Sequence, residues 1–126
     1  MYGTLVLQIK GGDRMRRILV VVDMQNDFID GVLGTAEAVA LVDPLAKAIR
    51  SFEGEVVFTR DTHGEFYAET QEGRNLPVPH CIRGTIGWEI RQELWEASAG
   101  NAARIFDKEA FGSRDLVAWL SEENSR

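Results

Sequence analysis

The sequence has a single cysteine, Cys81, so it cannot form a disulfide within the chain, and we expect a reducing cytoplasm as its location. We also expect no membrane span and no signal peptide, because the N-terminal apolar run, TLVLQI, is short and lacks a cleavage site. Basic residues are outnumbered by acidic ones, which leaves a formal net charge of -6. This charge argues against nucleic acid or an anionic membrane as a partner.

The length and composition predict one folded domain. The chain has 126 residues, of which 44% are hydrophobic, enough for a core although short for a doubly wound enzyme. Residues 4–9 have the composition of a strand, and residues 10–14 have that of a turn or linker. We therefore predict an N-terminal extension over residues 1–14 and one domain over residues 15–126.

The chain is organised around residues 16–28, which read RRILVVVDMQNDF. The run ILVVV shows no alternation of apolar and polar residues, which predicts a strand covered on both faces, as in a parallel α/β sheet. Asp23 then follows the carboxyl end of the strand, where open α/β sheets bind their ligands. Asp23 is therefore a candidate functional residue, and the alternative is that its carboxylate only hydrogen-bonds the following loop.

The rest of the sequence predicts alternating helices and strands. A helical period runs through residues 35–52, with either Thr35 or Asp43 as the N-cap, and we favour Asp43 because Pro44 suits the first position of a helix. Strands are predicted at 55–59 and 102–106, helices at 88–97 and 113–120 with Ser113 as N-cap, a long functional loop at 60–85, and a frayed end at 121–126. Right-handed crossovers would make this an α/β fold with a parallel sheet.

Polar residues follow each of the three predicted strands of this sheet. They are Asp23 after the first strand, the sequence Asp61-Thr62-His63 after the second, and Asp107-Lys108 after the third. A parallel sheet brings these strand ends to one edge, so we expect a functional site there.

Three of these loop residues could bind a metal ion. Asp61 and His63 are separated by one residue, and His80 lies in the same long loop. One carboxylate and two imidazoles would leave coordination positions open for water or substrate. The alternative is that His63 caps a turn and that His80 is an ordinary surface or core histidine.

Asp23 and Lys108 could form a second functional pair. A lysine beside a carboxylate in a crevice can stabilise a developing oxyanion, or the two groups can share the work of moving a proton and activating a nucleophile. The alternative is a salt bridge that only closes the strand ends.

Four ordered blocks of this sequence resemble the nicotinamidase branch of the isochorismatase-like cysteine hydrolases. The blocks read VVVDMQNDF, FTRDTH, LPVPHCIRGTIGWE and IFDKEAFGS, and the resemblance runs from Met15 to about Leu120. It implies a doubly wound parallel sheet with helices on both faces, in a Rossmann-like three-layer arrangement. It also implies hydrolysis of nicotinamide or a similar small amide through a thioester on a cysteine.

The resemblance also implies roles for individual residues. Asp23 matches the general base, Lys108 matches the catalytic lysine, and Phe28 matches a position that lines the substrate pocket. The metal ligands of the family match Asp61, His63 and His80 in this sequence. The resemblance therefore implies that these three residues bind a divalent ion, expected to be zinc.

The sequence departs from the family pattern at two places. Where the family often has a tryptophan that packs on the substrate ring, in a WPxHC block, this chain reads Leu76-Pro77-Val78-Pro79-His80-Cys81 and has no tryptophan there. The nucleophilic cysteine of relatives follows a fourth strand that this sequence does not contain, so we expect a C-terminally truncated domain. Cys81 matches a different, non-nucleophilic cysteine, and we expect it to be a buried apolar residue.

A truncated sheet would leave the strand over residues 18–22 with a bare apolar edge. We predict that either the TLVLQI segment or a second chain pairs with this edge, which favours an oligomer or a complementing chain. We consider three hypotheses for the function. The first is a nicotinamidase-like hydrolase, the second is an inactive relative that binds a metal or a small amide, and the third is an interaction module that needs a complementing segment.

Overall fold

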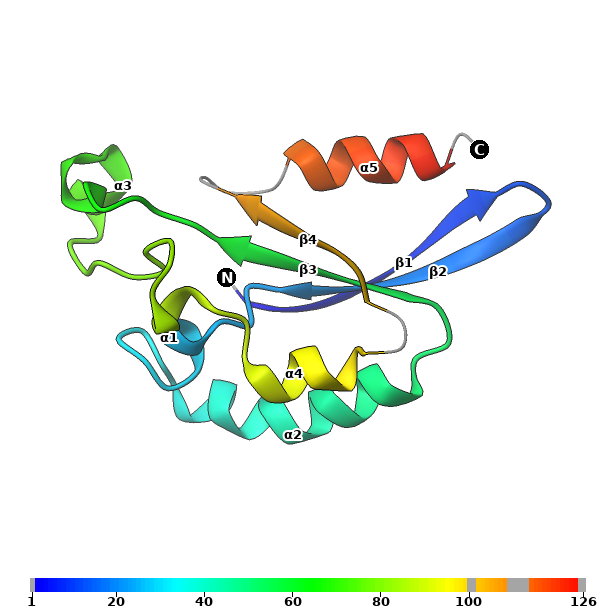
Figure 1. The fold of residues 1–126 in the computed structure, drawn as a ribbon, viewed down its shortest axis with the longest axis horizontal. Coiled ribbons are helices and arrows are strands. Elements are labelled where there is room, and N and C mark those ends of the chain that lie inside the picture. The colour runs from blue at the N-terminus through cyan, green and yellow to red at the C-terminus, as the bar shows by residue number, and fades with distance from the viewer. Residues whose placement is uncertain (1, 100–101, 109–113, 125–126) are drawn as a thin grey trace.

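The computed structural model describes residues 2–99, 102–108 and 114–124 and shows one sheet between two layers of helices (Figure 1). The sheet has the strand order β1-β2-β3-β4, in which β2, β3 and β4 are parallel and β1 is antiparallel to β2. The strands are β1 (Gly3–Gly11), β2 (Arg14–Val22), β3 (Glu55–Asp61) and β4 (Ala102–Lys108). The predicted parallel α/β sheet is confirmed, with one antiparallel strand added.

The added strand β1 covers the edge that the sequence left open. It forms a hairpin with β2 and pairs along its whole length, from Gly3 opposite Val22 to Gly11 opposite Arg14. Gly12 in the turn has φ 69°, a conformation that favours glycine. The TLVLQI segment therefore supplies the predicted partner of the Ile18–Val22 run, whereas the domain boundary between residues 14 and 15 stays a prediction.

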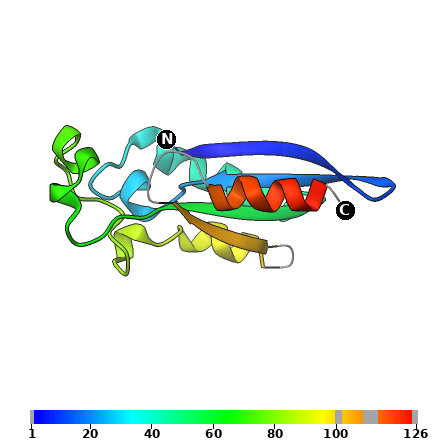
Figure 2. The same cartoon turned by 90° about the horizontal axis from the view of Figure 1, so that it is seen from above.

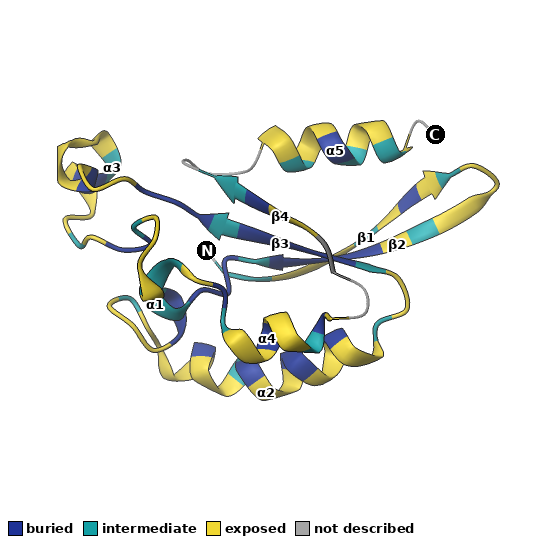
Figure 3. Ribbon diagram, in the orientation of Figure 1, coloured by how far each residue is buried: buried dark blue, intermediate teal, exposed yellow. Residues whose placement is uncertain are grey.

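Helices cover both faces of the sheet, and each face has its own apolar core (Figures 2 and 3). On one face, α2 (Ala36–Ser51) and α4 (Gln92–Ala97) pack over buried side chains that include Val21 and Phe58. On the other face, α5 (Arg114–Asn124) packs Trp119 over Val20 and Val57. Since β2 and β3 are buried from both sides, their apolar runs need no polar alternation.

Helix α2 begins eight residues earlier than the start that we favoured at Pro44. Thr35 is the N-cap, and its hydroxyl oxygen accepts a hydrogen bond from the Ala38 backbone N–H at 3.1 Å. Pro44 lies inside the helix on its exposed side, where water can bond the Ala40 carbonyl that proline leaves without a donor. The buried apolar stripe of α2 outweighs this local cost, so the prediction of a shorter helix was wrong.

Other predicted element boundaries also change. The loop over residues 60–85 contains two short helices, η1 (Tyr67–Glu69) and α3 (Gln71–Asn75). The helix expected from residue 88 begins only at Gln92, because η2 (Ile86–Trp88) precedes it and Ile90 forms a bridge with Gln25. Helix α5 continues to Asn124, into the predicted frayed end, and the expected N-cap at residue 113 lies outside the described residues.

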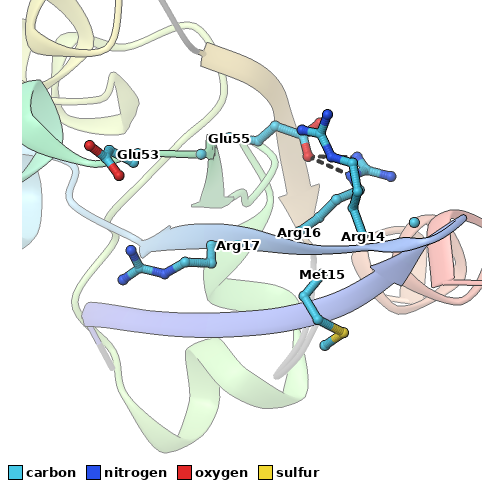
Figure 4. Close-up of a pocket in the computed structure, with 8 residues that line it drawn as sticks. Arg14, Met15, Arg16, Arg17, Glu53 and Glu55 are labelled. Atoms are coloured by element: carbon cyan, nitrogen blue, oxygen red, sulfur yellow. Dashed lines mark hydrogen bonds and ion pairs between the residues drawn. The ribbon is translucent and has the colours of Figure 1, made fainter.

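The amino ends of β2 and β3 form a shallow pocket of about 730 Å³ near the turn of the hairpin (Figure 4). Arg16 crosses it and pairs with Glu55 from β3 at 2.5 Å and with Glu123 from α5 at 2.8 Å. These contacts tie the hairpin, the sheet and the last helix together. Among the described residues, no helix combines the length and apolarity needed to cross a bilayer.

Candidate functional site

The carboxyl ends of the three parallel strands lie side by side at the other end of the sheet (Figure 1). Asp23 comes directly after β2, Asp61 is the last residue of β3, and Lys108 is the last residue of β4. Asp61 and Lys108 are also paired in the register of β3 and β4. The parallel sheet therefore brings together the polar residues that the sequence placed after each strand.

Asp23 and Lys108, here called the acid–lysine pair, form a buried ion pair. The Lys108 Nζ lies 2.8 Å from the Asp23 Oδ2, and the two side chains are 13% and 4% exposed. The other carboxylate oxygen accepts a hydrogen bond from the Thr59 hydroxyl at 2.7 Å. Asp23 has φ 52°, an uncommon conformation for a residue with a side chain, which marks this position as constrained.

Burial raises the pKa of Asp23 above its ordinary value of 3.8. The hydrogen bonds from Lys108 and Thr59 and the charge of Lys108 oppose this effect only in part, and the negative charge of Asp61 adds to it. A carboxyl group with a raised pKa is closer to the proton affinity that general acid–base catalysis requires near neutral pH. The acid–lysine pair therefore has the electrostatics of a proton-transfer site.

Asp61, His63 and His80, here called the Asp-His-His group, converge beside this pair. One ligand atom from each residue lies within 4.8 Å of the other two, and all three residues are buried. The Asp61 Oδ2 is 3.0 Å from His63 Nε2 and 3.4 Å from His80 Nε2. Two imidazole nitrogens and a carboxylate oxygen at this spacing fit a divalent cation such as zinc, with positions left for water or substrate.

The charges of the Asp-His-His group shift the pKa values of its members in opposite directions. Burial favours the neutral form of Asp61, but the hydrogen bond from His80 and the charge and hydrogen bond of His63 hold its pKa below the ordinary value. Burial likewise opposes a charged His80, but the Asp61 carboxylate and the Val78 carbonyl raise its pKa. A proton on His80 therefore gives this ring a positive charge next to the Asp61 carboxylate, at the position where a cation would bind.

Two residues that the sequence did not predict orient this group. The Glu72 carboxylate on α3 lies 3.7 Å from His63 Nδ1, so it faces the nitrogen that points away from Asp61. The Tyr67 ring packs edge-on against His63 and His80, with centroids 4.7 and 5.2 Å apart. Both residues come from the short helices in the loop, which carry too few residues for a periodic pattern to reveal them.

Phe28, the predicted substrate-lining residue, lies on α1 (Asn26–Ile29) and is buried. Its ring packs edge-on against His80, with the centroids 5.5 Å apart. Phe28 therefore borders the Asp-His-His group, and its contact with substrate stays a prediction. Leu76, in the block where the family often has a tryptophan, is 40% exposed.

Cys81 is fully buried directly after His80. Its backbone N–H donates to the Asp27 carboxylate at 2.8 Å, and its φ is 50°. Burial raises the pKa of its thiol strongly, and the negative charges of Asp61, Asp27 and Asp23 raise it further. Because the thiolate is the nucleophilic form, this environment disfavours attack by Cys81.

The sequence matches a known family and known enzymes over most of its length. A family model described as "Isochorismatase domain" matches residues 17–126. The nicotinamidase/pyrazinamidase of Mycobacterium tuberculosis is 36% identical over 103 residues, which cover 75% of this chain and 53% of that protein. The nicotinamidase of Saccharomyces cerevisiae is 25% identical and covers 81% of this chain, which spans 61% of its length.

Solved structures share the fold. The nicotinamidase/pyrazinamidase of Bacillus subtilis superposes with a TM-score of 0.65 at 27% identity, over 83% of this chain and 63% of that chain. The pyrazinamidase of Pyrococcus horikoshii in complex with zinc has a TM-score of 0.59 at 28% identity, with the same coverage. The chain thus spans between about half and two thirds of the length of these relatives.

Proposed function

Because the chain belongs to the isochorismatase family, we propose that it acts as a nicotinamidase-like amidohydrolase. The reaction would add water across the C–N bond of nicotinamide or a similar small amide and give the acid and ammonia. The observation that carries the proposal is the buried acid–lysine pair, 2.8 Å apart, beside the Asp-His-His group. The nicotinamidase relatives support the choice of substrate class.

Each group at the site would have a distinct role in this reaction. Asp23, whose pKa is raised by burial, would accept a proton from the attacking group and return it to the leaving nitrogen. The Lys108 ammonium would stabilise negative charge that develops on the carbonyl oxygen. Asp61, His63 and His80 would hold the divalent ion, expected to be zinc, which supplies Lewis acidity and orients the substrate when bound.

A second candidate function is binding without turnover. The observation that favours it is the environment of Cys81, the one cysteine of the sequence, which is buried and has a raised thiol pKa. Such a protein would bind the metal ion and a small aromatic amide beside Phe28. Alone, the chain would only bind the amide. It would catalyse hydrolysis only together with a complementing chain.

The partners and location complete the proposal. We expect a cytoplasmic protein with a small amide as its ligand. We also expect neither nucleic acid nor membrane as a partner, and the excess of acidic residues supports this second expectation. A homo-oligomer or a complementing chain remains the expected assembly. The position of β1 at the edge of the sheet supports this, because its outer backbone groups could pair with another strand and its side chains Leu5 and Val6 are half-exposed apolar groups.

The test is a nicotinamide-hydrolysis assay with added zinc on the purified chain, whose intact mass is measured in parallel. If the chain is an amidohydrolase, Asp23→Asn should reduce turnover by at least about 100-fold, because it removes the proton acceptor but keeps the size of the side chain. Asp13→Asn, an exposed acid in the hairpin turn, is the matched control and should leave turnover unchanged.

The same assay separates the two candidate functions. Zinc binding without turnover would reject hydrolysis by this chain and favour the binding function. Turnover that Cys81→Ala abolishes would make Cys81 the nucleophile, contrary to its raised pKa. Turnover that survives Cys81→Ala would show that another group of the site activates the attacking atom.

A further inference from the structure

A glutamine side chain, Gln25, lies fully buried two residues after Asp23. A buried carboxamide requires partners for its donors and acceptor. Its Nε2 donates to the Asp61 backbone carbonyl at 2.8 Å and to the Trp88 carbonyl at 2.7 Å, and its Oε1 accepts from the Asp61 backbone N–H at 2.9 Å. One side chain thus binds both backbone groups of a residue in the proposed metal site.

This arrangement continues the sheet beyond the end of β2. The pairing of β2 with β3 ends at Val22 opposite Thr59, and the Asp23 N–H then bonds the Thr59 carbonyl at 3.1 Å. Asp61 is two residues further along β3, so its N–H and C=O point to the same side as those of Thr59, where no strand remains. The carboxamide of Gln25 has the donor and acceptor of a peptide group and takes the place of the missing strand.

The two-point contact controls the direction of the Asp61 side chain. A single hydrogen bond would let the Asp61 peptide groups rotate, whereas bonds to both N–H and C=O hold the backbone on either side of its Cα. The opposite side of this segment is held as well, because the Thr62 N–H donates to the Lys108 carbonyl at 2.8 Å. The Asp61 carboxylate is therefore aimed at His63 and His80 by contacts that do not involve its own side chain.

The Trp88 carbonyl links Gln25 to a second contact with the same segment. The indole Nε1 of Trp88 donates to the Thr62 hydroxyl at 2.9 Å, and the Arg60 guanidinium lies 3.7 Å from the centroid of the indole ring. Residues on both sides of Asp61 are thus held by the segment that Gln25 binds. Gln25 also lies two residues after Asp23, so it joins the acid–lysine pair to the Asp-His-His group through a short path.

We propose that Gln25 is a positioning residue that aims the Asp61 carboxylate for binding a divalent cation and fixes its place relative to the acid–lysine pair. This role rests on the proposed function, because it requires that the Asp-His-His group bind a cation. Residues that orient metal ligands typically change metal affinity by about 10- to 100-fold when they are replaced.

The experiment measures the affinity of the full chain for zinc by competition with a chromogenic chelator. Gln25→Glu keeps the shape but loses the donors to two carbonyl groups, and Gln25→Met keeps the approximate length but loses every polar atom. Both should weaken zinc binding by about 10- to 100-fold at a temperature where circular dichroism shows folded protein. Asn26→Asp is the matched control, because the Asn26 side chain donates to the Ile86 carbonyl at an exposed position. The zinc affinity of this variant should stay within about twofold of that of the unaltered chain.

Each outcome has a distinct meaning. If the unaltered chain binds zinc and the folded Gln25 variants bind it equally well, the positioning role is wrong and the proposed metal site stands. If the unaltered chain binds zinc no better than a His63→Ala and His80→Ala double variant, both proposals about the metal fail. Gln25 variants that do not fold at any temperature would make the side chain a structural requirement and would overturn the positioning role.

Discussion

The two ends of the sheet both carry ion pairs, but they differ in burial and in what surrounds the charges. At the amino ends of the strands, Arg16 pairs with Glu55 (Figure 4) and with Glu123. The side chains of Arg16, Glu55 and Glu123 are 25%, 36% and 14% exposed. At the carboxyl ends, Lys108 and Asp23 are 13% and 4% exposed, and further titratable groups lie beside them.

We infer that this difference separates charges that hold the fold from charges that serve the proposed reaction. At the amino ends, water still screens the pairs, and each contact joins two elements that are distant in sequence. At the carboxyl ends, burial shifts the pKa of Asp23 upward and the neighbouring histidines shift that of Asp61 downward. A fold gains little from keeping such groups dry, so their burial is better explained by function.

The largest expected effect comes from breaking the acid–lysine pair. Lys108→Met should lower the free energy of unfolding by about 3 kcal/mol in urea titration, because it leaves Asp23 buried without its counter-charge. Adding Asp23→Asn should recover most of this loss, since the double variant buries no charge and asparagine tolerates the φ of 52° at this position. An equal loss in the single and double variants would show that the unpaired charge of Asp23 is not its cause.

A smaller effect should appear in the pH dependence of the metal-free chain. The folded pKa of His80 is raised, so its stabilising contribution is complete below the ordinary value of 6.5 and is lost as pH rises through the folded pKa. The folded pKa of Asp61 is lowered, so its contribution is present above 3.8 and is lost as pH falls through the folded pKa. With a chelator present, the thermal midpoint should therefore be highest between these limits.

Zinc and a substitution provide the controls for the pH profile. His80→Gln should remove the decline of the midpoint above pH 6.5, because the variant lacks the imidazole whose pKa folding raises. Zinc should bind more tightly as pH rises, since it competes with that proton. A decline above pH 6.5 that persists in His80→Gln would assign it to other groups.

The smallest effect is expected at the amino ends of the strands. Glu123→Gln removes one charge from the Arg16 contacts and should cost less than about 1 kcal/mol of unfolding free energy, with a smaller cost at high salt. Glu122→Gln on the same helix is the matched control, because Glu122 is exposed, and no change is expected. If Glu123→Gln lowered the free energy of unfolding as much as Lys108→Met does, the ion pairs at the two ends of the sheet would not differ in their contribution to stability.

Much of the site could be predicted from the sequence because its residues follow strand ends directly. An apolar run of five residues before Asp23 predicts a buried strand whose end carries a carboxylate, and the structure places Asp23 there. The same reasoning placed Asp61 and Lys108 at neighbouring strand ends. In each case the relevant information lies within a few residues of the chain.

Other features could not be predicted, because competing local signals were equally strong. Thr35 and the pair Asp43-Pro44 both resemble helix starts, and the burial of the apolar side of α2 decided for Thr35. The short helices that carry Tyr67 and Glu72 are stabilised by contacts with the site more than by their own periodicity.

The sequence by itself determined the class of fold, the three strand ends and the residues that could bind a metal ion, because periodicity and residue chemistry act over short stretches. Only the tertiary structure decided that the N-terminal segment, and not a second chain, pairs with β2. It also decided that Gln25 binds the backbone of Asp61 across 36 residues of sequence. The composition of the N-terminal segment predicts a strand but does not say with which chain it pairs, and the Gln25 contact joins segments too far apart to leave a local pattern in the amino-acid sequence.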